Sequence, residues 1–127
     1  MLKVYGKTDT GKVREVNQDC FAHGSLGEMA EWAVVCDGMG GENSGDVASQ
    51  MAVDVIGKHI LQNYRQGMGI NSIRAMILTA INAANAAIFE RAQQSEACHG
   101  MGTTVVVTVV RDGVAHIAHA GTPGRIL

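Results

Sequence analysis

Residues 32–41 read Trp32-Ala33-Val34-Val35-Cys36-Asp37-Gly38-Met39-Gly40-Gly41. A short apolar run ends abruptly at the carboxylate of Asp37, and a glycine-rich loop separates it from a helical pattern. The apolar run predicts a fully buried β-strand over 32–36, and the stability of such a strand requires no charge at its end. The glycines after Asp37 lack side chains, so the main chain can come close to an ion or other group bound by the carboxylate. The stretch therefore indicates either a metal ligand or acid–base group at Asp37, or simply the end of a strand.

Other strands are predicted on both sides of this one, over residues 2–6, 18–23, 103–110 and 114–120. The segment 103–110 is densely β-branched, which is typical of a strand. The turn Arg111-Asp112-Gly113 that follows it contains an Asp-Gly pair, which favours a two-residue hairpin. We therefore expect the last two strands to pair in antiparallel fashion.

Two long helices are predicted between these groups of strands. Residues 43–63 have helical apolar spacing with Asn43 or Ser44 as the N-terminal cap, and 71–95 repeat the pattern with Asn71 as the cap. The order β-β-β-α-α-β-β is not that of a parallel doubly wound sheet. It predicts an α+β fold in which helices cover one side of an antiparallel sheet.

Length and composition are those of one globular domain. The chain has 127 residues, of which 46% are hydrophobic, and the formal net charge is −2, which argues against nucleic acid as a partner. The apolar runs are too short to cross a bilayer and the N-terminus does not resemble a signal peptide, so no membrane partner is expected. Cys20, Cys36 and Cys98 are odd in number and form no CxxC motif, so we expect reduced thiols and a cytoplasmic location.

A second carboxylate, Asp19, stands where the strand 18–23 begins. If this strand forms a hairpin with 32–36, the start of one lies beside the end of the other, and Asp19 meets Asp37. Two carboxylates at one site repel unless a cation or a proton lies between them, and all-oxygen ligands favour Mg²⁺ or Mn²⁺. Arg14 would lie at the same rim and could bind a phosphate. The alternative is that both aspartates are turn residues and Arg14 is a solvated side chain.

Four motifs resemble those of the metal-dependent protein phosphatases (PPM, type 2C) of bacteria. They occur in the order of that family, with similar gaps, and the resemblance covers essentially the whole chain. The motifs are Thr8-Asp9-Thr10-Gly11-Lys12-Val13-Arg14-Glu15-Val16-Asn17-Gln18-Asp19, Val35-Cys36-Asp37-Gly38-Met39-Gly40-Gly41, Gly102-Thr103-Thr104 and Ala118-His119-Ala120-Gly121.

This resemblance implies a fold, an activity and a site. The fold is a partial α-β-β-α sandwich of antiparallel sheets with two long packed helices. Asp37 would bridge two Mn²⁺ or Mg²⁺ ions, the Gly38 carbonyl would bind one of them, and Asp19 would support the second directly or through water. Arg14 would hold the phosphate of a phosphoserine or phosphothreonine protein, which is hydrolysed by water without a covalent enzyme intermediate.

The chain departs from the family in two respects. The fourth family motif has an aspartate where this chain has Thr122, and Pro123 follows it. The resemblance also implies a domain about twice as long, so residues 1–127 correspond to an incomplete domain, its N-terminal half, without two later aspartates of the metal site. The altered tail and early end are those expected of a frameshift or gene fragment.

Three readings of the sequence remain, and the first is an incomplete phosphatase. We expect weak metal binding with little phosphatase activity, and self-association through uncovered sheet edges. A second reading is a non-catalytic phosphatase-like module that binds phosphoproteins or another partner through Arg14 and its exposed sheet. A third is an unrelated α+β fold in which Asp19 and Asp37 lie on different faces.

Overall fold

The computed structural model describes residues 19–39, 45–98 and 101–121 of the chain. Within them, one antiparallel sheet has the strand order β1-β2-β3-β4. The elements in chain order are β1 (Asp19–Gly27), β2 (Ala30–Met39), α1 (Gly45–Asn63), α2 (Ile70–Gln94), the short 3₁₀ helix η1 (Glu96–Cys98), β3 (Gly102–Arg111) and β4 (Val114–Ala120). The expected strand over 2–6 lies outside the described residues, as do the proposed caps Asn43 and Ser44.

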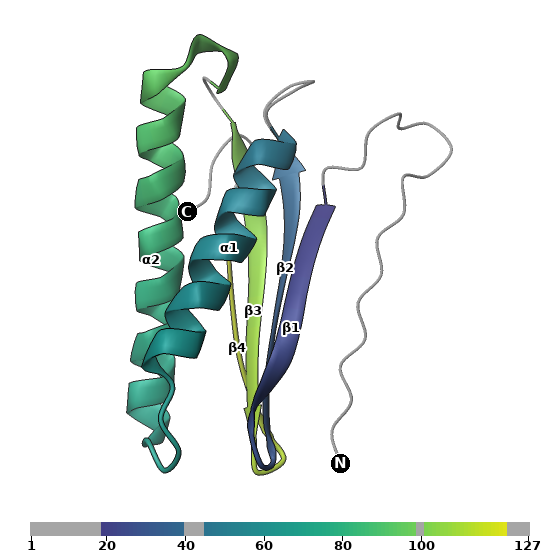
Figure 1. The fold of residues 1–127 in the computed structure, drawn as a ribbon, viewed down its shortest axis with the longest axis vertical. Helices are drawn as coiled ribbons and strands as arrows, with labels where there is room; N and C mark the ends of the chain where they lie inside the picture. The colour runs from purple at the N-terminus through teal and green to yellow at the C-terminus, as the bar shows by residue number, and fades with distance from the viewer. Residues whose placement is uncertain (1–18, 40–44, 99–100, 122–127) are drawn as a thin grey trace, which may run out of the picture.

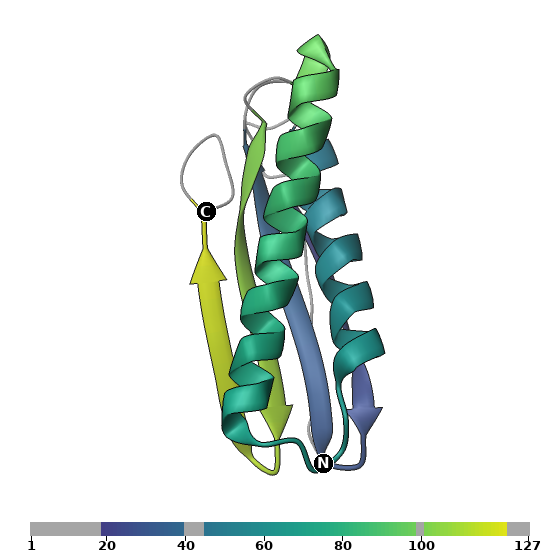
Figure 2. The ribbon, with the colours of Figure 1, turned by 90° about the vertical axis from the view of Figure 1, so that its left-hand side faces the viewer.

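Both long helices lie on the same face of the sheet, as Figures 1 and 2 show. Helix α1 packs mainly across β1 and β2, and α2 packs beside α1 over β3 and β4. This is the α+β arrangement that the order of elements predicts. The helices bury their apolar stripes against the helix-facing side chains of the strands, which is the usual way for a two-layer domain to form one core.

The strands alternate between a buried side and an exposed side. In β2 the side chains of Trp32 and Val34 are buried, whereas Val35 is 51% exposed; in β3 Val107 is buried and Val106 is 43% exposed. The prediction that 32–36 would be buried on both faces is therefore wrong. Among the described residues the helices cover one face of the sheet, so every second side chain points away from the core.

Trp32 fills the space between β1 and α1 because glycines leave room for its indole. A Cβ on Gly24 would lie 2.9 Å from Trp32 Nε1, and a Cβ on Gly57 would lie 3.0 Å from Trp32 Cη2. Glycine inside a helix is about 1 kcal/mol less favourable than alanine. Its presence at position 57 is explained by the ring that packs against it.

The two hairpins turn at the same end of the sheet (Figure 1). The second has Asp112 (φ 53°) and Gly113 (φ 79°) as its loop residues, which confirms the Asp-Gly hairpin. The Asp112 N–H donates to the carbonyl of Met29 in the first turn at 3.0 Å. Arg111 donates through Nη1 to the Met68 carbonyl, so the connection between the helices is held at this end too.

The N-cap of helix α2 is Gly69, two residues before the predicted cap Asn71, and the helix begins at Ile70. The Ile73 N–H donates to the Gly69 carbonyl at 3.0 Å, so the first helical bond forms before Asn71 could cap it. By length and composition alone α2 could cross a membrane. In this fold its apolar stripe faces α1 and the sheet, which is typical of a core helix; the expectation of no membrane partner stays a prediction.

Candidate metal and phosphate site

Asp37 lies near the end of β2, at the opposite end of the sheet from the two hairpin turns. Its neighbours Cys36 and Gly38 are buried on the helix side, and Asp37 itself is exposed. Alternation along the strand therefore places its carboxylate on the face that the helices leave open. β2 ends at Met39, two residues after Asp37, where the glycine-rich sequence begins.

Asp19 is the first residue of β1, and its backbone is the register partner of Asp37. Directly opposed residues of antiparallel strands have Cα atoms about 4.5–5.5 Å apart. The backbone therefore brings the start of β1, at Asp19, beside the end of β2, at Asp37, as the predicted hairpin requires. Arg14 lies outside the described residues, as does Thr122.

Gly38 has a strand neighbour on one side in the described part of the sheet. The pairing of β1 with β2 ends at Asp19 and Asp37, whereas Gly38 is still paired with Thr103 of β3. Among residues 19–39, 45–98 and 101–121, none pairs with β2 on its β1 side from Gly38 onward. A backbone carbonyl at such a position can serve as an oxygen ligand without giving up a bond in the middle of the sheet.

Thr103 and Thr104, at the start of β3, lie next to β2 at this end of the sheet, on the side opposite β1. Thr104 is the register partner of Asp37, so Asp19, Asp37 and Thr104 occupy one row across three strands. Thr103 is buried, and its hydroxyl donates to the Thr104 carbonyl at 2.8 Å. The Gly102-Thr103-Thr104 motif does not by itself place Thr104 beside Asp37. The signal that could have done so was the two-residue period of β3 combined with its pairing to β2.

Beneath this row a small polar cluster faces the helices. Cys36 is buried beside its register partner Cys20, and Ser49 Oγ of α1 lies 3.3 Å from Cys20 Sγ. Burial raises the pKa of the Cys36 thiol to about 12, nearby Cys20 adds to the rise, and a side-chain hydrogen bond with Thr103 lowers it in part. A thiol with this pKa stays protonated at neutral pH, so Cys36 is a core residue and a poor nucleophile.

The donor types at this end fit a hard divalent cation. An exposed carboxylate, a backbone carbonyl at a strand end and a second aspartate position directly opposite are oxygen donors, which Mg²⁺ and Mn²⁺ prefer. Within residues 19–39, 45–98 and 101–121, however, no group of three or more His, Cys, Asp or Glu side chains is close enough to hold a metal. The described residues therefore offer oxygen donors at this end of the sheet but no complete set of metal ligands.

The chain is similar in sequence and in structure to known protein phosphatases. A family model described as protein phosphatase 2C matches residues 10–123. Protein phosphatase PhpP of Streptococcus pneumoniae is 34% identical over 114 residues, covering 90% of this chain and 45% of that protein. The solved serine/threonine phosphatase of S. agalactiae superposes with a TM-score of 0.79 at 30% identity, covering 91% of this chain and 46% of that one.

Serine/threonine phosphatase Stp1 from Staphylococcus aureus is equally similar in structure, with a TM-score of 0.80 at 29% identity, covering 91% of this chain and 44% of that one. The chain spans about half the length of the curated relatives it matches, 45% in the case of PhpP. The family match and the register of Asp19 with Asp37 exclude the reading as an unrelated fold. On sequence and on fold alike, the chain belongs to the protein phosphatase 2C family.

Proposed function

We propose that this chain forms one part of a metal-dependent protein serine/threonine phosphatase, and that residues 1–127 belong to a single incomplete catalytic domain. The observation that carries the proposal is the register pairing of Asp19 with Asp37 at one end of the sheet, in a chain of the protein phosphatase 2C family. The relatives' names, protein phosphatase and serine/threonine phosphatase, support the reaction class.

Asp19, Asp37 and Gly38 at this end, together with Arg14, would have complementary roles in the proposed reaction. Asp37, the Gly38 carbonyl and Asp19 would together hold two divalent ions. When bound, Mn²⁺ or Mg²⁺ would supply positive charge and an activated water. Arg14 would bind the phosphate of a phosphoserine or phosphothreonine and hold it in line, and it would offset charge that builds on the phosphoryl oxygens.

The partial set of ligands sets the expected strength of the site. A divalent cation with two carboxylates and one carbonyl completes its octahedral shell with several waters, and its affinity falls with each missing charged ligand. We therefore expect weak binding of Mn²⁺ to this chain and little turnover. A cytoplasmic location is part of the proposal, and the free cysteines Cys20, Cys36 and Cys98 support it.

Paramagnetic broadening of amide signals by Mn²⁺ tests the site even when binding is weak. We expect the first signals to broaden to be those of Asp19, Asp37, Gly38 and Thr104. Asp37→Asn removes a charged ligand and should reduce this broadening about ten-fold or more at equal Mn²⁺. Asp112→Asn is the matched control, because Asp112 is exposed in the hairpin at the other end of the sheet. Broadening that centres elsewhere, or that survives Asp37→Asn, contradicts the site.

A second candidate function is a non-catalytic phosphatase-like module that binds phosphoproteins or another partner. The incomplete carboxylate set among the described residues favours it, as does Thr122 at a position where the family motif has aspartate. A phosphothreonine-peptide assay with Mn²⁺ separates the two. Turnover that Asp37→Asn abolishes supports the enzyme, whereas peptide binding without turnover supports the module.

A further inference from the structure

Two of the three cysteines of the chain face one another across neighbouring strands. Cys20 of β1 and Cys36 of β2 are register partners, one position along from the pair Asp19 and Asp37. Directly opposed residues of antiparallel strands have Cα atoms about 4.5–5.5 Å apart. A disulfide usually joins cysteines whose Cα atoms are about 4.4–6.8 Å apart. The backbone therefore already has the spacing that a bond between Cys20 and Cys36 requires.

Both thiols lie on the side of the sheet that α1 covers. Cys36 is fully buried, and Cys20, which is partly exposed, accepts a hydrogen bond from Ser49 Oγ of α1 at 3.3 Å. The Cys20 thiol in turn donates to Gln50 Oε1 at 3.5 Å. Cys20 is also near enough to raise the pKa of Cys36. The two side chains therefore lie together in the layer between β1, β2 and α1.

The pairing of these thiols is set by elements that the structure describes. β1, β2 and α1 surround them, and β1 is hydrogen-bonded to β2 along the whole register from Asp19 to Gly27. Paired strands lie about 4.7–4.9 Å apart, so no other element fits between them. The approach of Cys20 to Cys36 is therefore internal to the hairpin.

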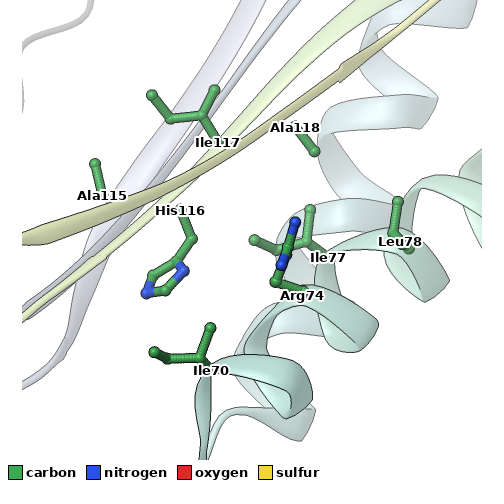
Figure 3. Close-up of a pocket in the computed structure, with 8 residues that line it drawn as sticks. All are labelled: Ile70, Arg74, Ile77, Leu78, Ala115, His116, Ile117 and Ala118. Carbon is green, nitrogen blue, oxygen red and sulfur yellow. The ribbon is translucent and has the colours of Figure 1, made fainter.

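The cavity between α2 and β4 is a separate feature of the molecule. It has a volume of about 390 Å³, and the side chains of Arg74 and His116 lie there beside apolar side chains (Figure 3). None of the described residues that line it is a cysteine, and β3 separates β4 from β2. The cavity therefore has no part in the chemistry of the two thiols.

We propose that Cys20 and Cys36 are a redox-modification site, at which mild oxidation forms an intramolecular disulfide and reduction opens it again. The bond joins β1 to β2 directly beside the row that contains Asp19 and Asp37, and it closes a loop of residues 21–35. In a reducing compartment both thiols stay free, and the bond forms when an oxidant is present. It holds the two strands together at the end of the hairpin that is farthest from its turn, where paired strands open most easily.

Hydrogen peroxide is an oxidant of the class that the step requires. Cys20, the more exposed partner, attacks one peroxide oxygen, and the O–O bond breaks to leave a sulfenic acid on Cys20 and one water. Sγ of Cys36 then attacks the Cys20 sulfur, so that the S–S bond forms, the S–O bond breaks and a second water leaves with the thiol proton. The two sulfurs together lose two electrons, which reduce the peroxide to water. Cys36 is a poor nucleophile toward solutes, but here its target is held directly opposite it.

Peptide mapping identifies the bond. The whole chain is oxidised with hydrogen peroxide at low protein concentration in the presence of a metal chelator, its remaining thiols are alkylated, and it is digested with endoproteinase Glu-C. This protease cuts after glutamate, so Cys20, Cys36 and Cys98 fall in three different peptides, 16–28, 32–42 and 97–127. We expect peptides 16–28 and 32–42 as one species, lighter than their sum by two hydrogen atoms and separated by dithiothreitol. Cys98 should be recovered alkylated, because it lies in η1, which packs against α2.

Thermal unfolding tests whether the bond fits the native fold. A disulfide that closes a loop of about 15 residues without strain should raise the Tm of the oxidised chain by about 5–15 °C over the reduced chain. Cys20→Ser and Cys36→Ala remove one partner each and should abolish this increase. Cys98→Ser is the matched control and should keep it.

Four results would overturn the proposal. They are a disulfide that joins Cys98 to either partner as the main product, cross-links that form only between chains, a Cys20 sulfinic acid with Cys36 still alkylated, and a Tm that oxidation leaves unchanged or lowers. Thiols that stay unreacted under conditions that oxidise free cysteine would do so as well. No measurement needs Mn²⁺ or turnover, so the result is independent of the proposed phosphatase activity.

Discussion

Gly121 leaves β4 with a φ of 122°, a region that is strained for residues other than glycine. A Cβ at this position would lie 2.7 Å from Thr104 Cα and 2.8 Å from the Thr103 carbonyl oxygen. Both of these atoms belong to backbone that cannot rotate away. One glycine thus lets the chain pass close to β3 directly beside the row that contains Asp37.

Gly121→Ala should therefore lower the free energy of unfolding by about 2–4 kcal/mol, from backbone strain and overpacking together. Gly113→Ala is the matched control. Gly113 also has a positive φ, 79°, but no atom lies within 4 Å of a Cβ built there, so the strain stands alone at about 1–2 kcal/mol. Urea unfolding of both variants measures the difference. If both variants lose the same free energy of unfolding, the contact of position 121 with β3 does not contribute to the loss.

The helices and strands owe their stability to the faces they bury, and α1 shows this most directly. Ile56 and Ile60 are fully buried against the sheet and α2, whereas Leu61, one residue further on, is 57% exposed. Helical spacing in the sequence indicates which residues share the apolar face, because the period of 3.6 residues is a property of the backbone. The bounds of α1 and α2 were predicted nearly in full for this reason.

Ile56→Ala should lower the free energy of unfolding by about 2–5 kcal/mol, because it removes buried methyl groups and leaves a cavity between α1 and the sheet. Leu61→Ala should change it by less than about 0.5 kcal/mol, since most of that side chain is already in water. Thermal and urea unfolding followed by circular dichroism provide the comparison. A loss of similar size in both variants would contradict this packing of α1.

At the scale of the whole described structure, the two helices cover one face of the sheet and no described element covers the other, the open face. Val35, Val106 and Ile117 are exposed on the open face, at 51%, 43% and 63%. Val35 and Val106 are direct register partners, so they form a continuous apolar area beside the row of Asp37. An exposed apolar face on a sheet favours association with other surfaces.

We expect the chain to self-associate with rising concentration through this open face and the sheet edges next to it. Val106→Thr keeps a β-branched residue but removes apolar surface, and it should weaken association by about ten-fold. Leu61→Thr removes similar exposed apolar surface from the helix layer and should leave association unchanged. Sedimentation velocity over a range of concentrations measures both. A monomer throughout, or an equal effect of the two substitutions, would contradict the expectation.

The sequence by itself determined the class of fold, because helical and strand periodicities are local and because Asp-Gly encodes its own hairpin. It also determined that Asp19 and Asp37 should meet, since two strands joined by a short turn pair in antiparallel fashion. Tertiary structure alone decided that β2 has one exposed face, because burial depends on which layers cover a sheet. It also decided the position of Thr104 beside Asp37, because these two residues approach one another only through the pairing of strands that are distant in the chain.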